Sequence, residues 1–128
     1  MRLLFDTHVL VWWFVGDLRI PERLRGLVSI SDTLVHVSAA TAWELATKHR
    51  IGKLPEAGPL VDEFFDFIDR CNFMRLPVTV EHGHRAGLLP GDHKDPFDRR
   101  LAAQALIEDL DLVTADPALA ALGARVMW

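Results

Sequence analysis

Four carboxylic acids, Asp6, Glu44, Asp98 and Asp116, each stand at a boundary between two expected secondary-structure elements. Carboxylates brought close together repel and raise one another's pKa values unless a cation lies between them. Mg²⁺ or Mn²⁺ accepts such an oxygen ligand set, whereas no pair of cysteines or histidines is spaced for zinc. A site of this kind activates water and neutralises charge on a phosphate, so we expect hydrolysis of phosphodiester bonds.

The stretch from His93 to Ala105 has an alternative interpretation, because its acids stand at the start of an expected helix. Asp95 is placed as an N-cap, Pro96 suits the first helical position, and Asp98 meets the positive end of the helix dipole. Capping alone explains both acids, and losing such a cap costs only about 1 kcal/mol. Arg99 follows on another face of the helix, where it could pair with an acid or hold phosphate.

Two of the acids follow apolar runs typical of central strands in a parallel sheet. Asp6 ends the run Arg2–Phe5, and Asp116 comes shortly after the run Leu110–Val113. Glu44 lies near the start of a helix that follows another short strand. Ligands of open α/β sheets bind outside the carboxyl ends of the strands, so these positions favour a shared site over surface placement.

Strands and helices alternate along the whole chain, which predicts an α/β fold. We expect a three-layer sandwich with a central, mainly parallel sheet flanked by helices. The expected strands are Arg2–Phe5, Leu34–Val37, Phe73–Leu76, Leu110–Val113 and a last strand or tail at Arg125–Trp128. The expected helices are Thr7–Val15, Pro21–Val28, Ala39–Arg50, Leu60–Cys71, Thr79–Leu88 and one that begins at Asp95. Two histidines in the Thr79–Leu88 helix, His82 and His84, are expected at the surface.

Composition limits the classes of protein that the chain fits. Its 128 residues are 50% hydrophobic, which suits a single domain over residues 1–128. The formal net charge of -4 provides no general basic field for nucleic acid. One cysteine allows no intramolecular disulfide, and no apolar run is long enough to span a membrane. We therefore expect a soluble, cytoplasmic protein.

Four blocks of the sequence together carry a resemblance to a known family. The chain resembles the PIN-domain ribonucleases, and among them the VapC-type toxins of toxin–antitoxin pairs. The resemblance covers nearly the whole chain and implies a PIN-like fold. Its blocks are Leu-Phe-Asp6-Thr7-His, Ser38-Ala-Ala-Thr-Ala-Trp-Glu44, Asp95-Pro-Phe-Asp98-Arg and Thr114-Ala-Asp116.

This resemblance implies roles for individual residues. It makes the four acids a quartet that holds Mg²⁺ or Mn²⁺, with Thr7 and Thr114 as hydroxyls that support the site or the attacking water. Asp95 is then an extra acid that acts as a cap or lies behind the ligands, and Arg99 binds substrate or supports the site.

The resemblance also implies a substrate and partners. RNA is cut by metal-activated water without a covalent intermediate, a homodimer forms, and a cognate antitoxin covers the groove. The apolar segments Trp12–Phe14 and Leu24–Val28 are the candidates for contact with a partner.

Two other interpretations compete with this one. A phosphatase of the haloacid dehalogenase kind also opens with an apolar strand that ends in Asp, but it needs a second Asp where this chain has His8. A non-catalytic protein-binding module, whose acids only cap helices, stays open as the alternative. Such a module would tolerate Asp6→Asn and show no specific dependence on Mg²⁺ or Mn²⁺.

Overall fold

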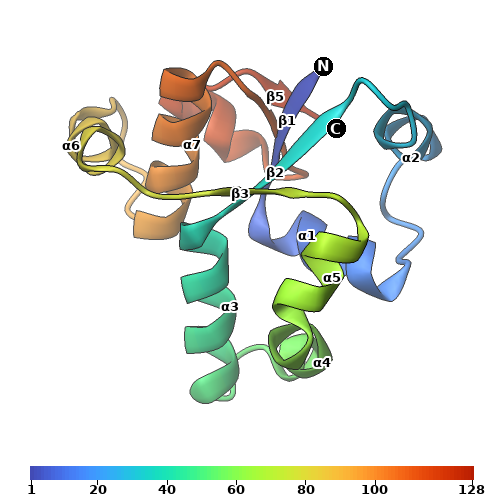
Figure 1. Cartoon of the computed structure of the whole chain (residues 1–128). Coiled ribbons are helices and arrows are strands. Elements are labelled where there is room, and N and C mark those ends of the chain that lie inside the picture. The colour runs from blue at the N-terminus through green and yellow to red at the C-terminus, as the bar shows by residue number, and fades with distance from the viewer.

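A computed structural model describes all residues from 1 to 128, and its centre is a five-stranded sheet (Figure 1). The strands are β1 (Arg2–Phe5), β2 (Leu34–Ser38), β3 (Met74–Leu76), β4 (Asp111–Val113) and β5 (Val126–Met127). Their order is β3-β2-β1-β4-β5, and every neighbouring pair is parallel. The carboxyl ends of β1, β2 and β4 therefore meet at one edge of the sheet.

Helices cover both faces of this sheet. They are α1 (Thr7–Val15), α2 (Glu22–Val28), α3 (Ala39–Arg50), α4 (Gly58–Asp62), α5 (Phe64–Arg70), α6 (Val80–Leu88) and α7 (Pro96–Glu108), with 3₁₀ turns at Pro55–Ala57 and Pro117–Leu122. Successive side chains of β1 point to opposite faces. Leu3 and Phe5 belong to a core formed with the helices α1 to α5, and Leu4 belongs to a second core with α7 and the C-terminal turn. The expected three-layer α/β sandwich is confirmed.

The helix expected over Leu60–Cys71 is wrong in detail, because the structure has two helices that meet at Glu63. The backbone of Glu63 leaves the helical region, with φ -106° and ψ 16°. Hydrogen bonds from Glu63 N–H to Pro59 and from Phe67 N–H to Glu63 still continue across this point. The result is a kink, and hydrophobic periodicity does not distinguish a kinked helix from a straight one.

His82 is buried, so the expectation of a surface histidine is wrong. Thr79 N–H donates to His82 Nδ1 at 2.9 Å, and His82 N–H donates to Thr79 Oγ1 at 3.2 Å. The imidazole thus takes the place that Glu or Gln holds in a capping box. Its Nε2 lies 3.0 Å from Glu108 Oε1, which ties the start of α6 to the end of α7.

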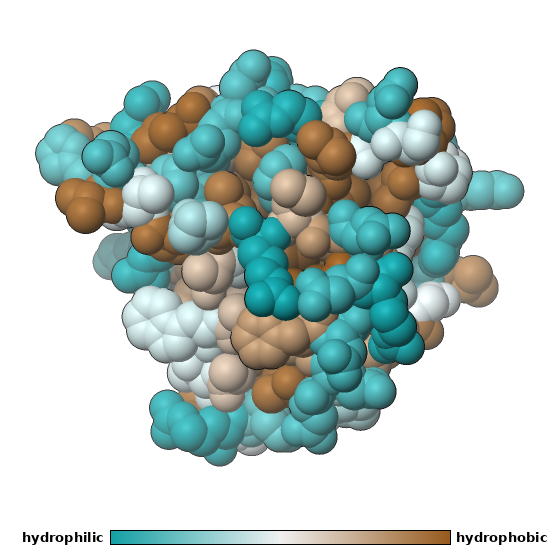
Figure 2. Space-filling view, in the orientation of Figure 1, coloured by the Kyte–Doolittle hydropathy of each residue, from teal (hydrophilic) through white to brown (hydrophobic).

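The aromatic residues of α1, which were candidates for partner contact, pack mainly within the chain. Trp13 lies 5.5 Å from Phe5, measured between ring centroids, and Phe14 lies 5.0 Å from Phe67. Hydrophobic and hydrophilic residues interleave over the face of the molecule seen in Figure 2. No helix combines the length and the apolar character that a membrane span requires.

Candidate active site

Two neighbouring strands bring Asp6 and Asp116 to the same edge of the sheet. Asp6 follows β1 and caps α1, where Thr7 N–H donates to Asp6 Oδ1 at 2.7 Å. Thr114 follows β4, and its hydroxyl donates to Asp6 Oδ2 at 2.7 Å. The N–H of Asp116 donates to the same Thr114 hydroxyl at 3.0 Å, and Asp116 caps the following 3₁₀ turn through Ala118 N–H. Thr114 therefore links the two acids.

Glu44 reaches the same edge from the second turn of α3, the helix that follows β2. Its side chain is buried, with 5% of the residue exposed. Thr7 Oγ1 donates to Glu44 Oε1 at 2.6 Å, and Lys48 Nζ donates to Glu44 Oε2 at 2.5 Å. Because the single proton of the Thr7 hydroxyl is used, the Thr41 hydroxyl at 3.2 Å donates to Thr7. Thr7 thus connects Glu44 to the start of α1.

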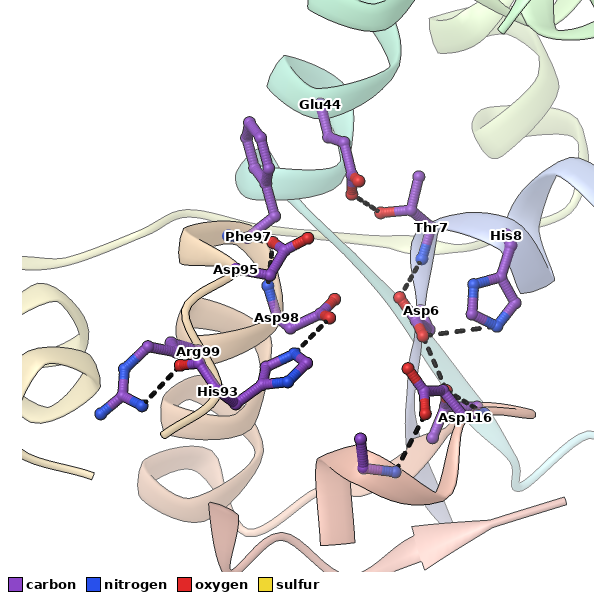
Figure 3. Close-up of polar contacts among 12 residues, drawn as sticks. Asp6, Thr7, His8, Glu44, His93, Asp95, Phe97, Asp98, Arg99 and Asp116 are labelled. Carbon is purple, nitrogen blue, oxygen red and sulfur yellow. Dashed lines mark hydrogen bonds and ion pairs between the residues drawn. The ribbon is translucent and has the colours of Figure 1, made fainter. Parts of the chain in front are cut away.

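Asp95 and Asp98 both stand at the start of α7, Asp95 as the N-cap and Asp98 in the first turn. Asp95 Oδ1 accepts from Phe97 N–H at 2.9 Å and from Asp98 N–H at 3.1 Å, so it is the N-cap. Asp98 Oδ2 lies 2.7 Å from His93 Nε2. The Asp95 side chain is thus occupied by backbone N–H groups, whereas the Asp98 side chain contacts His93 and is directed toward Asp6 (Figure 3).

Burial raises the pKa values of two of the acids, Asp98 and Asp6. It raises the pKa of Asp98 to about 6, and neighbouring Asp6 and Asp95 add to the increase, while the His93 hydrogen bond opposes it. Burial also raises the pKa of Asp6, and Glu44 adds to it, although the nearby His8 imidazole and hydrogen bonds lower it. The negative charge of a neighbouring acid thus contributes to each of these two pKa increases. The hydrogen bond to Asp98 in turn raises the pKa of His93.

The four acids come from four elements and face one another at the carboxyl edge of the sheet, and we call the space between them the crevice. Figure 3 shows Glu44, Asp98 and Asp116 directed toward Asp6 from different sides. No three acidic, histidine or cysteine side chains are arranged so that they could hold a metal ion. The chemistry of the donors nevertheless fits Mg²⁺ or Mn²⁺, because they are carboxylate oxygens with excess negative charge in a partly buried crevice.

Arg99 lies next to this crevice, but its donors are used by the backbone. They bind the carbonyl oxygens of Ala86, Leu89 and His93 at 2.9, 2.5 and 2.9 Å, respectively. Arg99 therefore anchors the loop that carries His93, which is a supporting position and leaves few donors for phosphate.

Three basic residues contact the acids in ways that the sequence interpretation did not predict. His8 Nε2 lies 3.5 Å from Asp6 Oδ2, Lys48 binds Glu44, and His93 binds Asp98. The spacing of Glu44 and Lys48 by four residues on one helix was a usable signal. Nothing comparable marks His93, since its contact crosses the boundary between a loop and a helix.

Comparison with known proteins agrees with this architecture. Residues 3–124 match the family model of the PIN domain. The chain belongs to the PIN domain family. The protein named Ribonuclease VapC16 from Mycobacterium tuberculosis is 37% identical to this PIN domain over 65 residues. These residues are 51% of this chain and 45% of that relative, so the similarity covers less than half of its length.

Solved structures of other proteins share the fold of this chain. FitAcB from Neisseria gonorrhoeae aligns with a TM-score of 0.70 at 22% identity, covering 100% of this chain and 97% of that chain. VapBC2 from Rickettsia felis, solved bound to a DNA fragment from their promoter, aligns with a TM-score of 0.67 at 14% identity, covering 99% and 98%. The resemblance to VapC-type PIN domains that the sequence indicated is confirmed.

Proposed function

We propose that this PIN domain protein is an endoribonuclease that hydrolyses RNA phosphodiester bonds with Mg²⁺ or Mn²⁺, as the toxin of a toxin–antitoxin pair. The observation that carries the proposal is the meeting of Asp6, Glu44, Asp98 and Asp116 from four elements at one crevice. The raised pKa values of Asp6 and Asp98 support it, because buried carboxylates whose pKa values rise by burial and by one another's charge are typical of functional sites. The similarity to Ribonuclease VapC16 supports the choice of substrate.

The four acids would hold the ion. When bound, the ion would activate water and neutralise negative charge on the scissile phosphate. The other residues fix the acids in place. Thr114 orients the Asp6 carboxylate through its hydroxyl, and Thr7 does the same for Glu44. Asp98, with a pKa of about 6, is ionised at neutral pH.

The proposal extends to the assembly. Residues 1–128 act as one PIN-like domain, form a homodimer in the cytoplasm and are covered by a cognate antitoxin. The likeness to VapBC2 and FitAcB supports the toxin–antitoxin setting.

Cleavage of total cellular RNA by the purified protein tests the activity. Wild type is compared with Asp98→Asn in Mn²⁺, in Mg²⁺ and in chelator, after removal of any bound antitoxin. Asp69→Asn is the matched control, because Asp69 is an exposed acid paired with Arg75 away from the crevice. We expect discrete metal-dependent products from wild type and Asp69→Asn and none from Asp98→Asn. Identical traces from all three proteins would overturn the catalytic proposal and favour a binding module.

A further inference from the structure

An exposed aromatic cluster lies beside the acidic crevice. Trp43 on α3 and Phe97 on α7 meet edge to face, with ring centroids 5.2 Å apart and an interplanar angle of 74°. The guanidinium of Arg100 lies over both rings, 5.1 Å from the Trp43 centroid and 6.0 Å from the Phe97 centroid. We call Trp43, Phe97 and Arg100 the aromatic platform. Trp43 is 56% exposed, so much of its surface faces solvent.

The same two helices, α3 and α7, carry the aromatic platform and two of the four acids. Trp43 directly precedes Glu44, and Phe97 stands between Asp95 and Asp98. Figure 3 shows Phe97 beside Asp95, on the side of the crevice where Glu44 descends from α3. A polymer that places one phosphate among the acids would therefore bring its next units to the platform.

The positive charge at the platform has no polar partner within the chain. No hydrogen bond or ion pair holds the Arg100 guanidinium, and its Nη1 is buried without a partner. Its neighbour Arg99 differs, since carbonyl oxygens occupy its donors. Stacking on Trp43 and Phe97 is thus what positions Arg100. A solvent-exposed indole next to an uncommitted guanidinium matches a nucleotide, which offers a flat base and an anionic phosphate.

We propose that Trp43, supported by Phe97 and Arg100, stacks one nucleobase of the RNA adjacent to the scissile phosphate and so sets the position of the cut. This inference rests on the proposed function, which it deepens by naming residues that select the substrate. The positive charge of Arg100 favours a polyanion over an apolar protein surface. Contact of Trp43 with a second protein chain is the competing outcome of the test.

Fluorine NMR of protein labelled with 5-fluorotryptophan reports on the stack directly. The chain has four tryptophans, and Trp43→Phe assigns the Trp43 resonance. Asp98→Asn serves as the host so that RNA stays intact in Mg²⁺. The probes are a six-nucleotide oligoadenylate and an abasic ribose-phosphate oligomer of the same length and charge. We expect the Trp43 resonance to shift with oligoadenylate and to stay in place with the abasic oligomer.

The affinity for oligoadenylate, measured in the same Asp98→Asn background, gives the size of the contribution from Trp43. Trp43→Ala is expected to weaken oligoadenylate binding about tenfold or more, and Trp43→Phe to retain most of the affinity. Phe65→Ala is the matched control, because Phe65 is 60% exposed and likewise stacks with an arginine, Arg75, but does not belong to the platform. It should leave the affinity unchanged. Equal shifts with both oligomers, or a Trp43 shift that depends on protein concentration without RNA, would overturn the proposal.

Cleavage assays keep this inference separate from the proposed function. In otherwise wild-type protein, Trp43→Ala should scatter the cleavage positions that wild type selects. Unchanged cleavage positions and affinity in Trp43→Ala would overturn the platform and leave the ribonuclease intact. Stacking of oligoadenylate on Trp43 in a protein that cleaves no RNA would instead support the platform and overturn the proposed function.

Discussion

Asp98→Asn is expected to stabilise the metal-free protein although it removes the proposed activity. Burial raises the pKa of Asp98 from 3.8 to about 6, and the hydrogen bond from His93 does not compensate for it. Asparagine has the same shape and retains a carbonyl oxygen that accepts from His93 Nε2. The substitution therefore removes a charge that disfavours folding and keeps its hydrogen bond.

The size and the pH dependence of this effect follow from the shift in the pKa. A change from 3.8 to about 6 corresponds to about 3 kcal/mol. The side chain is 17% exposed, so solvent screening reduces our expectation to about 1–2 kcal/mol. Below the unfolded pKa of 3.8, Asp98 is neutral in both states and costs nothing. Between this pKa and about 6 the unfolded chain ionises first, so the stability of wild type falls and stays lower above pH 6.

Urea unfolding followed by tryptophan fluorescence, in chelator at pH 4, 6 and 8, measures this difference. We expect Asp98→Asn to exceed wild type in free energy of unfolding at pH 8 and to match it near pH 4. Asp66→Asn is the control, an exposed acid in the first turn of α5, and should change stability by less than about 0.5 kcal/mol.

Adding Mg²⁺ should reverse the order of wild type and Asp98→Asn. An ion at 100 times its dissociation constant stabilises the protein that binds it by about 2.7 kcal/mol, and wild type alone should bind tightly. If wild type is the more stable protein in chelator at pH 8, the charge of Asp98 is well compensated in the fold and the reasoning from burial fails.

Three further changes test other contacts. Thr114→Val removes the 2.7 Å hydrogen bond to Asp6, and we expect RNA cleavage to fall about 10–100-fold while circular dichroism stays unchanged. Calorimetry should show that Mg²⁺ affinity falls as the pH is lowered through about 6, because Asp98 takes up a proton there. A pH-independent affinity would exclude Asp98 as a ligand. His82→Ala should lower the free energy of unfolding by about 2–3 kcal/mol in urea, because Glu108 and the start of α6 lose their buried partner.

The positions of the acids could be predicted because they depend on the order of elements along the chain. Apolar runs identify β1 and β4 as central strands, and parallel strands end at one edge, so Asp6 and Asp116 had to meet there. Glu44 followed from the same argument applied to β2 and α3. Asp95 as an N-cap followed from local chemistry alone, and its two backbone hydrogen bonds confirm it.

Contacts between elements could not be predicted in the same way. The meeting of His93 with Asp98, and of Trp43 with Phe97, depends on how a loop and two helices pack. The burial of His82 likewise depends on α7 lying against α6, since surface and buried histidines share the same local sequence pattern. Periodicity assigns a residue to a face of a helix, but it does not say which side chain covers that face.

Basic partners explain how several carboxylates lie near one another in the metal-free protein, although no three of them are arranged to hold a metal ion. Asp6, Glu44 and Asp98 each have their own basic partner, His8, Lys48 and His93 respectively. Lys48 alone among these partners carries a permanent charge, and the two imidazoles are cationic only when protonated. A divalent cation held by these acids would therefore compete with Lys48 for Glu44 and with protons for Asp6 and Asp98. Such pairing reduces the repulsion among the acids in the metal-free fold, and under the proposed function this competition would set the metal affinity.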